Sequence, residues 1–143
     1  IEDKFGSTSY AQQAALLAAR VYQDKARPAD ARKQLTWVID KSDDAGYQAL
    51  ARLRLAALWI EEKNFDAARQ QLSAKAPVSF EPLFADRLGD IDLLENKPTQ
   101  AIKNYQKAWK GFDANAEYRR LVAVKLAALG ADPEETAAKE PTK

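Results

Sequence analysis

The stretch that decides the fold covers residues 88–108 and reads LGDIDLLENKPTQAIKNYQKA. Its Asn-Lys-Pro turn separates two helical segments, because Pro98 fits the first turn of a helix, where its missing N–H is not needed. Gly89 in the first segment and Ala101 in the second are small enough to let two helices cross closely. Tyr105 and Ala108 follow on the same face of the second segment. The stretch therefore predicts a helical hairpin.

The spacing of these residues matches the tetratricopeptide pattern, a hairpin repeat of about 34 residues. Laid on the preceding sequence, the pattern finds two further units, and the anchoring alanines Ala31, Ala68 and Ala101 stand at intervals that bracket this period. Because an isolated hairpin cannot bury the apolar stripes that it carries, we expect the hairpins to stack on one another. The residues predicted to pack the repeats are Ala19, Tyr22, Ala31, Ala56, Trp59, Ala68, Gly89, Ala101, Tyr105 and Ala108.

The predicted fold is all-α, with tetratricopeptide-like helical-hairpin repeats in an α-solenoid of about seven helices. Composition agrees, because 28 Ala and 15 Leu stand against only 15 Val, Ile and Thr among 143 residues, and β-branched residues favour strands. The expected organisation is a lead-in over 1–8, a domain over 9–130 and a flexible tail over 131–143. Within the domain we expect units at about 9–40, 44–75 and 82–111, and a final helix at 116–129.

Catalysis has little support in this sequence. The chain contains no His and no Cys, which removes the side chain that titrates near neutral pH, the thiolate nucleophile and the commonest ligands of transition metals. We expect no enzymatic activity, no cofactor and no metal site. A Ser–Lys pair is the one nucleophilic arrangement that the sequence leaves open.

One group of acidic residues is a candidate for a metal site or an acid/base pair. It consists of Glu81, Asp86, Asp90, Asp92 and Glu95. Asp86 and Asp90 share one helix face, and a solvated surface is the favoured interpretation of that pattern. A surface that binds a cation or recognises Lys and Arg side chains is the alternative.

Charge and the aromatic residues argue against nucleic-acid binding. The 22 basic residues nearly cancel the 21 acidic ones, leaving a net charge of +1, so no general field attracts phosphate. The aromatic side chains are spread over the predicted helices without basic clusters, which favours packing over base stacking.

The third predicted helix carries the strongest binding signal. Positions 2, 5, 9 and 12 of a first helix face the concave groove in this repeat geometry, and in the middle unit they hold Leu50, Leu53, Ala57 and Ile60. Either another helix of the same protein covers this face, or a partner segment binds there. Asp86 and Asp90 are the groove candidates in the third unit.

A carboxylate clamp for a C-terminal tail is disfavoured. Such clamps need cationic or amide donors in the groove. The corresponding positions hold Leu16, Leu53, Asp86 and Asp90, and only Arg20 fits.

Residues 84–97, FADRLGDIDLLENK, followed by Gln100-Ala101 and by residues 105–108, resemble the YfgM-like family of ancillary SecYEG translocon subunits. The Ala-Asp-x-x-Gly-Asp helix start at residues 85–90 is the marker. The resemblance extends over most of residues 9–129. It implies an inner-membrane protein with one N-terminal transmembrane helix and a periplasmic domain with tetratricopeptide-like repeats.

The same resemblance implies partners: the SecYEG translocon, the periplasmic chaperone PpiD and newly exported, unfolded proteins, all without catalysis. The chain begins Ile1-Glu2-Asp3 and has no Met, so we expect that a preceding segment, such as the anchor, belongs to the full protein. The alternatives are a self-associating structural repeat module and a cytosolic adaptor.

Overall fold

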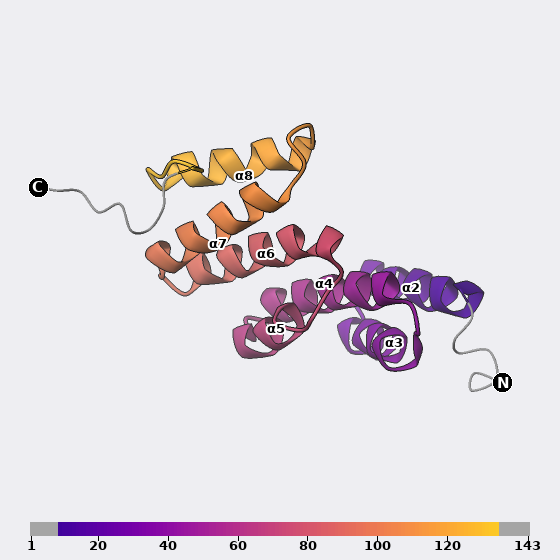
Figure 1. Ribbon diagram of the computed structural model, residues 1–143. Helices are drawn as coiled ribbons and strands as arrows, with labels where there is room; N and C mark the ends of the chain where they lie inside the picture. Colours follow the sequence, from indigo (N-terminus) through magenta and orange to yellow (C-terminus); the bar gives the residue numbers. More distant parts are fainter. Residues whose placement is uncertain (1–8, 135–143) are drawn as a thin grey trace, which may run out of the picture. The chain divides into compact units, whose positions relative to one another are not determined.

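The computed structural model describes residues 9–134, and the chain divides into two compact units, the first ending at Pro77 and the second beginning at Val78. The lead-in predicted for 1–8 lies outside the described residues, as does the tail from residue 135 onward. Between residues 9 and 134 all regular secondary structure is helical and consists of seven α-helices and a short 3₁₀ helix, joined by turns (Figure 1). The predicted all-α fold is thus confirmed.

The first unit contains two hairpins. They are formed by α2 (Ser9–Asp24) with α3 (Pro28–Lys41) and by α4 (Ala45–Glu61) with α5 (Phe65–Leu72). Helix α3 also packs against α4, and the colours in Figure 1 show that α2 and α4 run in the same direction. The apolar core between α2, α3 and α4 consists of Ala15, Leu16, Ala19, Ala31, Leu35, Val38, Ala51, Leu55 and Leu58.

Local capping explains where the helices of this unit begin. The carboxylate of Asp44 accepts hydrogen bonds from the backbone N–H groups of Gly46 and Tyr47, at 2.7 and 3.1 Å, at the start of α4. The amide oxygen of Asn64 accepts one from Ala67 at the start of α5. Both side chains satisfy backbone donors that have no partner inside the helix.

The second unit begins with the 3₁₀ helix η1 (Val78–Phe80), which lies between the repeats predicted at about 44–75 and 82–111. It continues with α6 (Glu81–Leu94), α7 (Pro98–Gly111) and α8 (Glu117–Ala128). Helix α7 packs against both α6 and α8, as Figure 1 shows. The apolar core of the second unit consists of Ala85, Ala101, Tyr105, Ala108, Val122 and Leu126.

The turns inside the three hairpins share one backbone conformation. Ala26, Lys63 and Asn96 all have positive φ, at 56°, 61° and 60°. In each turn the next N–H donates to a carbonyl near the end of the first helix, for example from Lys97 to Asp92 at 2.8 Å. This is the Schellman type of helix end, and its recurrence makes the repeat visible in the backbone.

The residues predicted to pack the repeats lie in the interior. Tyr22 and Trp59 are partly buried, and the other eight of that set are buried. At Gly89 the neighbouring helix comes close, because a Cβ built there would lie 2.5 Å from the Tyr105 ring. The unit predicted at about 44–75 is slightly shorter in the structure, where α5 ends at Leu72.

Candidate functional site

One candidate surface lies on α4. Leu50 is 37% exposed, and Leu53, Ala57 and Ile60 are partly exposed. The opposite side of α4 is buried, through Ala51, Leu55 and Leu58 among others. The helix therefore uses one face for the core of its own unit and leaves accessible apolar atoms on the face where the repeat pattern places the groove. We call these four residues, Leu50, Leu53, Ala57 and Ile60, the α4 face.

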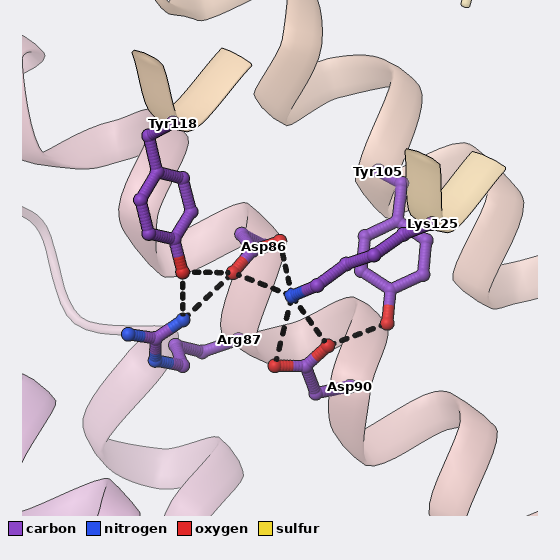
Figure 2. Close-up of polar contacts among 6 residues, drawn as sticks. All are labelled: Asp86, Arg87, Asp90, Tyr105, Tyr118 and Lys125. Carbon is purple, nitrogen blue, oxygen red and sulfur yellow. Dashed lines mark hydrogen bonds and ion pairs between the residues drawn. The ribbon is translucent and has the colours of Figure 1, made fainter. Parts of the chain in front are cut away.

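A cluster of charged and phenolic side chains joins the three helices of the second unit (Figure 2). The ammonium group of Lys125 on α8 donates to both carboxylates, at 3.0 Å from Asp86 Oδ1 and 3.1 Å from Asp90 Oδ1. The Tyr118 hydroxyl donates to Asp86 Oδ2 at 2.9 Å, and the Tyr105 hydroxyl to Asp90 Oδ1 at 2.5 Å. Helix α8 is thus bound to α6 by polar side chains as well as to α7 by apolar ones.

Arg87 completes the cluster. Its guanidinium group donates to Asp86 Oδ2 at 2.7 Å and to the Tyr118 hydroxyl, as the dashed lines in Figure 2 indicate. Asp86 therefore accepts from an arginine, a lysine and a tyrosine. Buried carboxylates require such pairing, since an uncompensated charge in the interior is strongly unfavourable.

Electrostatics in the cluster favour the protonated forms of its donors. Burial opposes the charged form of Lys125, but the hydrogen bond and charge of Asp86, together with Asp90, outweigh it and raise the pKa of Lys125. Burial and the nearby carboxylate of Asp90 raise the pKa of the Tyr105 hydroxyl. For Arg87, burial is again outweighed, by Tyr118 and Asp86, and the pKa rises. These donors hold their protons through the physiological range.

The favoured interpretation of the acidic group as a solvated face is wrong for two of its members. Asp86 and Asp92 are each 0% exposed. Asp86 belongs to the cluster just described, and Asp92 accepts a hydrogen bond from the Asn104 amide at 2.7 Å. The cations that meet this face are side chains of the same chain.

This burial also changes the role expected for Asp86 and Asp90, the two groove candidates of the third repeat. Asp86 has no exposed surface to offer a partner. Asp90 keeps 32% of its side chain exposed, although both of its oxygens already lie within hydrogen-bond distance of Lys125. The pair therefore positions α8, and the α4 face is the part of the predicted set that stays accessible. Nowhere between residues 9 and 134 do three or more carboxylates gather as a cation site would need.

Sequence reasoning missed Lys125, Tyr118 and Arg87 as members of the cluster. A signal was available for two of them. If the repeat pattern is continued into the last helix, Tyr118 and Lys125 fall at positions that correspond to Ala51 and Leu58 on α4, which pack in the core with the preceding hairpin. The same positions on α8 face Asp86 and Asp90.

Comparison with known proteins agrees with the repeat assignment. The model of the tetratricopeptide repeat-like domain family matches residues 1–131. No solved structure gave a significant match. None of the described helices is long and apolar enough to cross a bilayer.

A curated relative is the protein named ancillary SecYEG translocon subunit from Neisseria gonorrhoeae, which is 31% identical over 129 residues. The match covers 90% of this chain and 62% of the relative, so the chain spans less than two thirds of that protein. The resemblance to the YfgM-like family is confirmed by this match. With all but its last residues matched by the family model, the chain belongs to the tetratricopeptide repeat-like domain family.

Proposed function

We propose that residues 9–130 form the protein-binding domain of an inner-membrane protein that associates with the Sec translocon, with this domain in the periplasm. In this role it assists exported proteins together with periplasmic chaperones such as PpiD, by binding and without a chemical step. The name of the gonococcal relative and the family match support this assignment.

The observation that carries the proposal is the α4 face. Apolar side chains that remain accessible at groove positions favour apolar segments of other chains, because each Å² of apolar surface removed from water contributes about 25 cal/mol. Newly exported proteins expose such segments before they fold, and membrane-bound partners expose them at their surfaces. Tetratricopeptide-like arrays generally present extended surfaces for binding other proteins.

Copurification tests the proposal. We would express the complete gene with an affinity tag, solubilise the membranes in mild detergent, and measure the SecYEG retained. Wild type should retain the translocon, and Leu53→Asp should weaken retention while leaving the helical circular dichroism unchanged. Leu121→Asp is the matched control, since Leu121 is an exposed leucine on α8.

Two results would contradict the proposal. One is a wild-type protein that retains no translocon component. The other is a loss in Leu121→Asp as large as that in Leu53→Asp, which would show that the α4 face has no special role.

A self-associating structural module is the second candidate. It is favoured by Tyr10, Leu17 and Val21, which lie along one side of α2 and are exposed. Light scattering over a concentration series separates the two, since a self-associating module gains mass with concentration and Leu17→Asp should abolish that gain.

A further inference from the structure

Two arginines of the first unit, Arg20 on α2 and Arg54 on α4, lie near enough for the charge of one to act on the other. The amide of Gln13 on α2 donates to the Tyr47 hydroxyl on α4 at 2.8 Å, so these two positions lie side by side. Arg20 and Arg54 stand seven residues further along each helix, close to two full turns. Because both helices rise by the same amount per residue, Arg20 and Arg54 come to lie near each other about 10 Å further along.

Their electrostatics agree with this placement. Burial, and next the positive charge of Arg20, lower the pKa of Arg54. Arg54 is partly buried and Arg20 is exposed. Two guanidinium groups this near repel each other, and a negative charge bound between them would turn that repulsion into attraction.

The chain itself does not supply that charge within residues 9–134. Arg27, Arg32 and Arg87 form ion pairs with carboxylates, whereas no ion pair or hydrogen bond joins Arg20 or Arg54 to an acidic side chain of the described residues. Leu50 lies one turn before Arg54 on the same helix and is accessible. The arginine pair therefore stands beside the apolar surface already proposed to bind partners.

We propose that Arg20 and Arg54 bind side-chain carboxylates of an extended partner segment whose neighbouring apolar residue packs on Leu50. The inference rests on the proposed function and names the chemistry of its partner, an acidic-apolar segment. Guanidinium groups suit this task, because their planar donors match a carboxylate and remain charged at any physiological pH. The contact with Leu50 buries an apolar side chain of the partner, and the arginines favour acidic segments over neutral ones.

NMR titration of the purified chain with three peptides tests the proposal. Two of the peptides have a blocked C-terminus and one has a free C-terminal carboxylate. The first is acetyl-Ala-Leu-Asp-Asp-Leu-Ala-amide, and the second replaces both Asp residues by Asn. The third is the Asn peptide with a free C-terminal carboxylate. Because a guanidinium group forms charge-assisted hydrogen bonds with a carboxylate but not with an amide, we expect the Asp peptide to bind about tenfold more tightly than the Asn peptide.

Substitutions assign the effect. Arg54→Gln and Arg20→Gln should each remove most of the preference for the Asp peptide. Arg120→Gln removes the same charge from an exposed position on α8 and should keep it. In the free protein Arg54→Gln should leave the melting temperature unchanged or raise it, since it removes a repulsion, whereas a structural arginine would lower it on removal.

Equal binding of the Asp and Asn peptides would overturn the inference, as would no binding of either. Tightest binding of the peptide with the free C-terminal carboxylate would also overturn it, because the charge would then come from a chain end. These outcomes leave the proposed function standing if Leu53→Asp still weakens translocon retention. If retention fails while the Asp preference persists, the proposed function alone is wrong.

Discussion

The ring of Tyr105 occupies the space in which a side chain on Gly89 would stand, since a Cβ there would lie 2.5 Å from ring atom Cε1 and 2.7 Å from Cδ1. Real Cβ atoms do not approach so closely, so one of the two helices or the ring itself would have to move. The ring has little freedom, because Tyr105 is fully buried and its hydroxyl is bound to Asp90. The close crossing of α6 and α7 therefore depends on the absence of a side chain at position 89.

Gly89→Ala should lower the free energy of unfolding by about 1–3 kcal/mol, the usual cost of an overpacked core. Urea denaturation followed by circular dichroism measures this. Adding Tyr105→Leu should recover part of the loss, because the two sites touch and their effects are not additive. A Gly89→Ala protein as stable as wild type would contradict the close packing, since Ala has the higher helix propensity.

Lys125→Met should destabilise the second unit by about 2–4 kcal/mol, because it leaves the buried carboxylate of Asp86 without its ammonium partner. Arg87 and Tyr118 remain as donors and limit the loss. The double variant Asp86→Leu with Lys125→Met should be more stable than Lys125→Met alone, since no charge is then left uncompensated. Equal stabilities of the single variant and wild type, measured by urea midpoints, would show that the pair contributes nothing.

Alkaline pH should weaken the second unit. The pKa values of Tyr105 and Lys125 are raised in the folded state, so the folded chain holds these protons more tightly than the unfolded chain. Their contribution is therefore fully present below the ordinary values of 10.0 and 10.5. It is lost as the pH rises above them through the folded-state pKa values.

Urea midpoints measured from pH 8 to 11.5 test this dependence. Tyr105→Phe should be less stable than wild type at pH 8, since it loses the bond to Asp90, and should decline less steeply above pH 10. Tyr10→Phe, at an exposed position on α2, should follow wild type. A wild-type stability that rises between pH 10 and 11.5 would contradict the account.

Lys63→Gly should stabilise the first unit by about 0.5–1 kcal/mol, because Lys63 adopts a left-handed conformation with φ of 61° that is unfavourable for a side chain. Lys33→Gly is the matched control, since Lys33 is exposed in the interior of α3. There the same change should cost about 1 kcal/mol. Thermal melts of both variants give the signs, and two losses of equal size would refute the assignment of the turn.

The helices were predictable from sequence because their signals are local. Pro98 marks a helix start, and the spacing from Gly89 to Ala108 identifies the repeat. The left-handed residues Ala26 and Lys63 carry no such signal, because neither is a glycine, and their conformation follows from the hairpin as a whole.

The candidate site was less predictable. Asp86 and Asp90 have the spacing of a solvated helix face, and nothing near them in sequence shows that one is buried. Their partner Lys125 comes from another helix and reaches them only when α8 packs on α7. The positions on the α4 face followed from repeat geometry, whereas the proximity of Arg20 to Arg54 becomes visible only in the folded chain.

Site-specific photocrosslinking in living cells tests most directly the central claim that the α4 face binds other proteins. A photoreactive amino acid would replace Leu53 on this face or Leu121 on α8 in the protein expressed from its complete gene. We predict that position 53 crosslinks to a SecYEG subunit, to a periplasmic chaperone or to an exported protein, and that position 121 does so far less. Crosslinks of equal yield at both positions, or none at position 53, would contradict the claim.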